Sequence, residues 1–238
     1  MLVSRALCES RMEAQELISA GAVLVDGVVC LKQSKDVKDT AEIAVTKRRE
    51  FVSRGGEKLQ GALLHIFHNT DNVRQFCLNK SVLDIGSSTG GFSDCLLAYG
   101  VATVDAVDVG ANQLHHRLRD NNRITLYENT DIRNFSSSKK YSIIVADVSF
   151  ISLSSIFDSI VHFCSKGVTI FLLIKPQFEV GKGNTKKGIV KNEELTQSIL
   201  KKYQDSAFQN GFGEVEVFKS SIQGGDGNQE YFLYGVKQ

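Results

Sequence analysis

The chain has a single proline, Pro176, among its 238 residues, and it contains neither an internal repeat nor a low-complexity tract. It also lacks an uninterrupted apolar run long enough to span a bilayer, and no secretory signal follows Met1. These absences disfavour a membrane protein and a secreted protein. We therefore expect a cytoplasmic protein that does not act on membranes.

Cysteine and excess charge are also scarce. The five cysteines are odd in number, and no two of them have the spacing of a metal site or a redox motif. We interpret them as reduced thiols, and we expect no metal. The formal net charge is only +1, so bulk charge does not indicate a nucleic-acid partner, and any such partner must be inferred from local basic clusters.

Residues 1–46 have the pattern of a small α+β module. We predict a short helix over Leu2–Cys8 and a second helix that begins after Ser10, a good N-cap residue. Gly21 fits the position just after that helix. The pair Asp26-Gly27 lies between two strand-forming segments, which strongly predicts a β-hairpin. The segment AEIAV adds a further strand.

From about residue 55 the chain alternates between apolar strands and helices. This alternation predicts an α/β domain with a mostly parallel sheet that is covered on both faces. A glycine-rich loop, SIQGGDGNQ, separates the last two strands, which predicts an antiparallel hairpin at the sheet edge. We therefore divide the chain into a small domain over 1–46, a basic linker over 47–54 and a larger domain over 55–238.

The stretch VLDIGSSTGGFSD predicts a ligand site at the end of a strand. Gly86 turns the chain, and Gly90-Gly91 allow the backbone to approach a ligand at a helix N-terminus. Asp108 ends the next strand, where it can accept hydrogen bonds from both hydroxyls of a ribose. With Asp84 inside the stretch, this pattern favours a nucleoside-type cofactor. The spacing departs from G-x-G-x-x-G, which disfavours a dinucleotide and hence a nicotinamide-dependent oxidoreductase.

Two further strands end on charged residues. Asp147 follows IIVA, and Lys175 follows TIFLLI immediately before Pro176, so the carboxyl ends of both strands should meet at one edge of the sheet. Asp147 could instead be a helix N-cap or a solvated strand end, and Lys175 a strand end whose amine extends to water. Glu230 would reach the same edge if the last strand runs antiparallel. Lys58, taken alone, is a surface lysine on the first turn of a helix.

Basic residues concentrate in two places. Lys47, Arg48, Arg49, Arg54 and Lys58 lie in or beside the linker, and Lys182, Lys186, Lys187 and Lys191 flank a glycine-containing loop after Lys175. Charge clusters of this kind are usually solvated surfaces. Two clusters on either side of one predicted site nevertheless favour a phosphate-rich substrate.

Together the stretches FVSRGGEKL, VLDIGSSTGGFSDCLL, VDVG, ADVSFISL and IKPQFE resemble the TlyA (hemolysin A) family, and CESRMEAQELISAGAVLVDGVV resembles its S4-like RNA-binding module. The resemblance covers nearly the whole chain. It implies a Rossmann-like class I methyltransferase of the FtsJ type that uses S-adenosylmethionine and methylates ribose 2′-hydroxyls, usually of cytidine, in ribosomal RNA or ribosomal subunits. It leaves the oligomeric state unknown.

The resemblance also assigns residues. It places a catalytic tetrad on Lys58, Asp147, Lys175 and Glu230. The implied cofactor-binding residues are Asp84, Gly86, Ser88, Thr89, Gly90, Gly91, Phe92, Asp108, Val109, Asp131, Ile132 and Asp147. The implied RNA-binding residues are Arg5, Arg11, Lys47, Arg48, Arg49, Arg54, Lys182, Lys186 and Lys187. Two positions depart from the family pattern, because Asp131 replaces an asparagine and Ser87 replaces an alanine.

The implied chemistry explains why charges end these strands. A ribose hydroxyl is a poor nucleophile until its proton is removed, and a lysine that is desolvated or near another cation can remove it. We expect Lys175 to be this base, with Lys58 nearby, and Asp147 and Glu230 to orient the two lysines. Methyl transfer of this kind requires no metal.

Two alternatives from other classes remain. A membrane-active hemolysin would need an apolar or amphipathic segment that can enter a bilayer, but the best candidates are strands needed in the core. A non-catalytic RNA-binding protein would not need all four tetrad positions together with the glycine loop.

Overall fold

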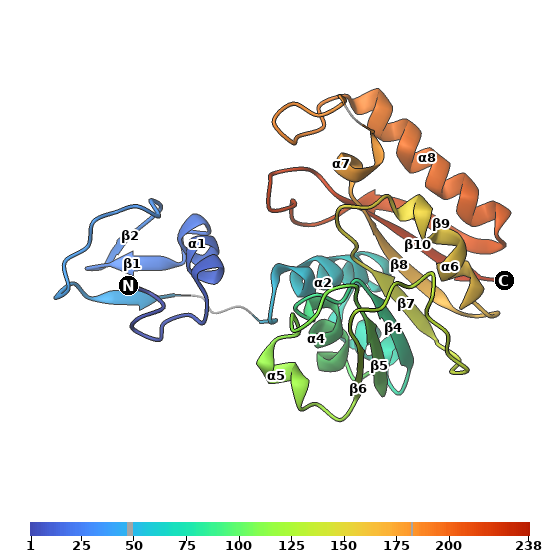
Figure 1. Cartoon of the computed structure of the whole chain (residues 1–238), viewed down its shortest axis with the longest axis horizontal. Coiled ribbons are helices and arrows are strands. Elements are labelled where there is room, and N and C mark those ends of the chain that lie inside the picture. Colours follow the sequence, from blue (N-terminus) through green and yellow to red (C-terminus); the bar gives the residue numbers. More distant parts are fainter. Residues whose placement is uncertain (47–49, 182) are drawn as a thin grey trace. The chain divides into compact units, whose positions relative to one another are not determined.

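The computed structural model describes residues 1–46, 50–181 and 183–238, without the side chains of Met12 and Glu16. The chain forms two compact units, Met1–Glu50 and Phe51–Gln238, each with its own hydrophobic core (Figure 1). Lys47, Arg48 and Arg49 of the predicted linker and Lys182 lie outside the described residues.

Helix α1 (Arg11–Ser19) in the first unit begins where its N-cap was predicted. Ser10 Oγ accepts a hydrogen bond of 3.1 Å from the Glu13 backbone N–H, and Glu13 Oε2 accepts one of 2.8 Å from the Glu9 backbone N–H. The Ser10 hydroxyl thus satisfies one of the donors that a helix start leaves without partners, and the Glu13 carboxylate fixes the backbone just before the cap, in a variant of the capping box. Gly21, with φ at 69°, ends the helical segment in the left-handed region.

The predicted hairpin is confirmed. Strands β1 (Val23–Val25) and β2 (Val28–Val29) pair antiparallel across Asp26 and Gly27, which both have positive φ. Two positive φ values in succession are the signature of the two-residue turn that matches strand twist. Strand β3 (Ile43–Val45) pairs antiparallel with the other side of β1, giving the order β2-β1-β3.

The predicted helix over Leu2–Cys8 is wrong, because this segment consists of turns and bends. Ala6 has a φ of 54°, a left-handed conformation that an α-helix cannot contain. The Leu7 backbone N–H donates to the Leu2 carbonyl and closes the turn. Leu2 and Cys8 are nevertheless buried in the core of the module.

The second unit contains a seven-stranded sheet with the order β6-β5-β4-β7-β8-β10-β9. Its strands are β4 (Ser81–Ile85), β5 (Thr103–Val107), β6 (Ile124–Tyr127), β7 (Ile143–Ala146), β8 (Thr169–Ile174), β9 (Phe212–Lys219) and β10 (Tyr231–Lys237). Strands β4 to β8 are parallel, whereas β10 is antiparallel to both β8 and β9. The predicted α/β class and the antiparallel edge are confirmed.

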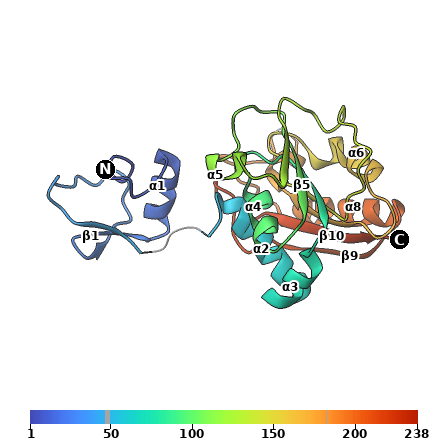
Figure 2. The same ribbon diagram turned by 90° about the horizontal axis from the view of Figure 1, so that it is seen from below.

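Helices cover both faces of this sheet (Figures 1 and 2). One face carries α2 (Arg54–Phe67), α3 (Thr70–Cys77), α4 (Gly91–Ala98) and the short α5 (His116–Arg119), and the other carries η1 (Leu153–Ser155), α6 (Phe157–His162) and α8 (Glu193–Gln209). Successive residues along the central strands pack alternately into the two cores, as Val82 and Leu83 do. Apolar residues on both sides explain why these strands are continuous hydrophobic runs.

Several helices differ from the prediction in extent. The residue pattern predicts a helix over Glu57–His68, but α2 begins three residues earlier, at Arg54, and α3 was not predicted at all. The segment NQLHHRLRD, for which the sequence predicts a helix, is helical only over the single turn of α5. The α2 boundary matters for function because it places Ser53 and Gly55 at a helix start next to the glycine loop.

Candidate active site

The charged strand ends lie together because β7 and β8 are parallel neighbours, with Ala146 opposite Leu172. Asp147 follows β7 directly, and Lys175 follows β8. Pro176 occupies the first position of α7 (Pro176–Glu179), where its missing N–H costs no hydrogen bond. The proline therefore ends the strand and starts a helical turn, which leaves Lys175 at the edge of the sheet.

Lys175 does not extend to solvent. It is 8% exposed, and its Nζ lies 2.6 Å from Asp147 Oδ1. Asp147 Oδ1 accepts no hydrogen bond of favourable geometry, so this contact is mainly an ion pair. The aligned hydrogen bond of Lys175 Nζ goes instead to Ser149 Oγ, at 2.7 Å. Burial with a carboxylate excludes the interpretation of Lys175 as a solvated strand end.

A second buried ion pair joins residues that are distant in sequence. Lys58 Nζ, on the second turn of α2, lies 2.6 Å from Glu230 Oε2, and the two residues are 7% and 2% exposed. Tyr231 of β10 pairs with Ile174 of β8. Glu230, which precedes β10, and Lys175, which follows β8, therefore lie at the same edge of the sheet. Both lysine–carboxylate pairs are therefore part of one region.

The glycine loop packs tightly against this edge. Gly86 has a φ of 74°, and a Cβ there would lie 2.7 Å from the Asp147 carbonyl oxygen. Asp108 fastens the other side of the loop, because its Oδ2 accepts from the Ser88 backbone N–H and its Oδ1 from the Gly110 backbone N–H, both at 2.7 Å. The Asp108 carboxylate is thus held in one orientation at the end of β5.

A cleft of about 130 Å³ lies where these parts meet. Seven of its lining residues were predicted from the sequence: Gly86, Ser88, Thr89, Gly91, Phe92, Asp147 and Lys175. Four were missed: Ser53, Gly55, Ser87 and Ser149. A Cβ at Gly91 would lie 2.2 Å from Ser53 Oγ, so α2 and α4 begin in direct contact at this cleft. The SRGG sequence at the start of α2 was the available signal for Ser53 and Gly55.

In addition to Asp147 Oδ1, two buried polar atoms beside the cleft have no hydrogen-bond partner within the described part of the chain. Burial, the largest cause, raises the pKa of the Asp84 carboxyl to about 7. A hydrogen bond of 2.6 Å from Ser93 Oγ lowers the pKa but is the smaller effect. Asp84 Oδ1 has no hydrogen-bond partner, and neither has Ser87 Oγ. Native proteins leave few such groups, and those at clefts commonly find partners in ligands or water.

Comparison with known proteins accounts for this arrangement. Residues 51–237 match the model of the FtsJ-like methyltransferases, and residues 1–43 match the S4 domain. A protein named Hemolysin A from Brachyspira hyodysenteriae is 39% identical over 98% of this chain and 96% of its own length. The chain belongs to the TlyA (hemolysin A) family of FtsJ-like methyltransferases.

Other proteins are similar to this chain over most of its length. The 16S/23S rRNA (cytidine-2′-O)-methyltransferase TlyA of Mycobacterium tuberculosis is 38% identical over 98% of this chain and 87% of its own length. A solved structure of a candidate hemolysin from Streptococcus thermophilus matches with a TM-score of 0.76 and 32% identity over 100% of this chain and 86% of that chain. Within the described residues, no helix has the length and apolarity needed to cross a membrane.

Not every residue that the family resemblance assigned to the cofactor lines the cleft. Asp131 forms a bidentate pair with Arg133, and hydrogen bonds from this guanidinium are the main cause that lowers the pKa of Asp131 to about 2. Ile132 is buried in the core, and Val109 is 70% exposed at the end of β5. Gly90, with φ at 90°, starts α4, and a Cβ there would meet Leu118.

One exposed aromatic residue was not predicted. Phe150 is 88% exposed, and its φ of 66° is unusual for a bulky side chain. It follows Ser149 directly, and its ring centroid lies 5.5 Å from that of Phe178, three residues after Lys175. An aromatic surface is therefore exposed to solvent beside the two strand ends.

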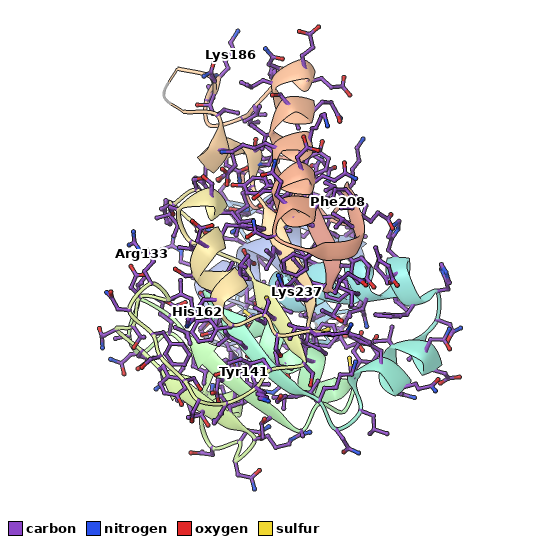
Figure 3. All side chains as sticks on the ribbon, turned by 90° about the vertical axis from the view of Figure 1, so that its right-hand side faces the viewer. Arg133, Tyr141, His162, Lys186, Phe208 and Lys237 are labelled. Atoms are coloured by element: carbon purple, nitrogen blue, oxygen red, sulfur yellow. The ribbon has the colours of Figure 1, made fainter. Side chains whose placement is uncertain are left out.

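The predicted basic residues have different environments. Arg5 donates to the carbonyls of Ala41 and Asp39 in its own module, and Arg54 donates to the carbonyl of Gln223. Arg11, Lys186 and Lys187 are exposed. Figure 3 shows Lys186 extending from the loop between α7 and α8. This loop is held in place by Asn228, which accepts from the Val190 backbone N–H and donates to the Gly188 carbonyl.

Proposed function

We propose that this chain transfers a methyl group from S-adenosylmethionine to the 2′-hydroxyl of a cytidine in ribosomal RNA. The observation that carries the proposal is the pair of buried ion pairs, Lys175–Asp147 and Lys58–Glu230, at the edge of the sheet that carries the glycine loop. The FtsJ-like family and the S4 domain support a methyltransferase with an RNA substrate.

The residues around the cleft suit S-adenosylmethionine. The cofactor has a nucleoside, which Asp108 would hold by its ribose, and a methionine part with an ammonium and a carboxylate. Asp84 Oδ1 is a buried acceptor without a partner and suits the ammonium end. Gly86 and Gly91 line the cleft, and the absence of their side chains allows the loop to pack against Asp147 and Ser53, which places backbone groups at the site. The cofactor supplies the methyl group as an electrophile.

Lys175 would remove the proton from the ribose hydroxyl. Its amine lies at the cleft and is largely buried, so a substrate hydroxyl bound there would be within its reach. The Asp147 carboxylate, at 2.6 Å, then balances the positive charge that Lys175 acquires. General-base catalysis of this kind typically contributes a factor of about 10² to 10⁴.

Lys58 would stabilise the negative charge that develops on the ribose oxygen. Glu230 holds its ammonium at 2.6 Å and is itself buried, so the pair is fixed in place before substrate arrives. Charges that are already oriented cost no reorganisation during the reaction. The two lysines therefore have different tasks, one accepting a proton and one supplying a positive charge.

RNA would be held by several parts of the chain. The S4 domain supplies an RNA-binding module, and the loop with Lys186 and Lys187 supplies positive charge on the side of the sheet where Glu230 lies. Phe150 offers an exposed aromatic face on which a nucleobase can stack, as bases withdrawn from an RNA helix commonly do.

The proposal is tested by incubating the full chain with labelled S-adenosylmethionine and purified small and large ribosomal subunits. We expect label in ribosomal RNA at a single cytidine or very few, resistant to alkaline cleavage on the 3′ side because the 2′-oxygen is methylated. Label on a base, or on protein only, would contradict the proposal. Lys175→Met provides the catalytic control.

A further inference from the structure

Ser149 interacts directly with Lys175. It lies two residues after Asp147 in the loop that follows β7, and it lines the cleft. Lys175 Nζ donates a 2.7 Å hydrogen bond to Ser149 Oγ. The Asp147 carboxylate is closer, at 2.6 Å, but its contact lacks hydrogen-bond geometry. Ser149 is therefore the directional partner of the lysine, and Asp147 is the electrostatic one.

The geometry of a lysine nitrogen gives this hydrogen bond a consequence. A neutral amine has two N–H bonds and one lone pair at the three positions that the carbon leaves free. If one N–H points to Ser149 and the Asp147 carboxylate attracts the other, only one direction remains for the lone pair. Proton transfer depends on that direction, because the lone pair must point to the hydroxyl proton.

We infer that Ser149 is a positioning residue that orients the lone pair of Lys175 toward the ribose hydroxyl. This role rests on the proposed function, in which Lys175 is the base. If Ser149 has no such role, its replacement removes this hydrogen bond without changing the methylation rate.

Three single variants separate these roles. Ser149→Ala removes the acceptor, whereas Ser149→Thr keeps a hydroxyl at the same carbon. Ser155→Ala is the matched control, because Ser155 is an exposed serine in the same segment whose hydroxyl donates a 2.7 Å hydrogen bond to the Ser152 carbonyl. All three are compared with the parent chain in single-turnover methylation of ribosomal subunits, with thermal unfolding as a check of the fold.

For Ser149→Ala we expect the maximal methylation rate to fall about tenfold to a hundredfold. The subunit concentration that gives half-maximal rate and the affinity for S-adenosylmethionine should stay within about twofold of the parent. Ser149→Thr should recover the rate to within about threefold, and Ser155→Ala should match the parent. This separation of rate from binding would not result from a purely structural role.

A double-mutant cycle tests whether Ser149 acts through the lysine. In a Lys175→Met background, Ser149→Ala should cause no further loss, because the group that it orients is gone. The inference is overturned if Ser149→Ala methylates like the parent, if the threonine variant fails to recover the rate, or if the two losses multiply. A parent chain that labels no ribosomal RNA overturns the proposed function and this inference with it.

Discussion

Tyr231 lies directly opposite Ile174 where β10 pairs with β8, and this register places Glu230 beside Lys175 at the edge of the sheet. Because β10 is antiparallel to β8, the residue that precedes β10 lies next to the residue that follows β8. A residue from the last segment of the chain thereby joins residues from β7, β8 and α2. The predictions below test what this arrangement does.

Replacement of Lys175 by arginine should lower the single-turnover methylation rate by a factor of about 10² to 10⁴. Arginine keeps the positive charge near Asp147 but does not release a proton near neutral pH, so it cannot act as a base. Affinity for S-adenosylmethionine, measured by calorimetry, should barely change.

The matched control for this variant is Lys201→Arg. Lys201 also forms a lysine–aspartate ion pair, with Asp205 at 3.0 Å, but on the exposed surface of α8. The Lys201→Arg variant should methylate ribosomal RNA at the same rate as the parent chain. A Lys175→Arg variant that stays within a few-fold of the parent would show that Lys175 acts only as a charge, and Lys58 would then be the next candidate for the base.

Replacement of Asp108 by alanine should weaken the binding of S-adenosylmethionine by roughly 2–4 kcal/mol, because two charge-assisted hydrogen bonds to the ribose are lost. Calorimetry measures this change directly. Asp120→Ala is a suitable control, since Asp120 is an exposed aspartate that follows α5. Unchanged affinity in Asp108→Ala would remove Asp108 from the cofactor site.

The stability of the protein should fall as pH rises between about 4 and 7 because of Asp84. Burial, the largest cause, raises its folded-state pKa to about 7, whereas an unfolded chain has an ordinary aspartate value near 4. In this range the folded state therefore binds the proton more tightly than the unfolded state does, and rising pH favours unfolding. The resulting cost above pH 7 is on the order of a few kcal/mol.

Urea unfolding at pH 5 and pH 8 measures this effect. Asp84→Asn carries no titrating group, so its loss of stability between the two pH values should be smaller than that of the parent by roughly 2–4 kcal/mol. Asp120→Asn should behave like the parent. Equal pH dependence in the parent and Asp84→Asn would contradict a raised pKa at this position.

The N-terminal module should deliver RNA and take no part in methyl transfer itself. A fragment over residues 47–238 retains Phe51, which packs in the core of the larger unit, and should bind S-adenosylmethionine like the full chain. It should methylate ribosomal RNA poorly. RNA binding by the full chain should weaken steeply with salt, because phosphate contacts release counterions. Full methylation of the same nucleotide by the fragment would argue against this delivery role.

Much of the fold followed from local pattern. Apolar strands alternating with helices predicted the α/β sheet, and a capping residue, a hairpin pair and a glycine pair predicted turns, because each depends on residues that are close in sequence. The prediction failed at Leu2–Cys8, where Ala6 adopts a left-handed conformation that composition does not reveal. It also missed α3, whose apolar residues are few.

The sequence by itself determined which charges end the strands, since Asp147 and Lys175 follow apolar runs whose parallel ends must share an edge. Only the tertiary structure decided their partners. Insertion of β10 between β8 and β9 brings Glu230 to the site, and the start of α2 brings Lys58 and Ser53. Ser149 became visible only through its hydrogen bond to Lys175. Contacts between distant segments depend on packing and register, which local sequence patterns do not encode.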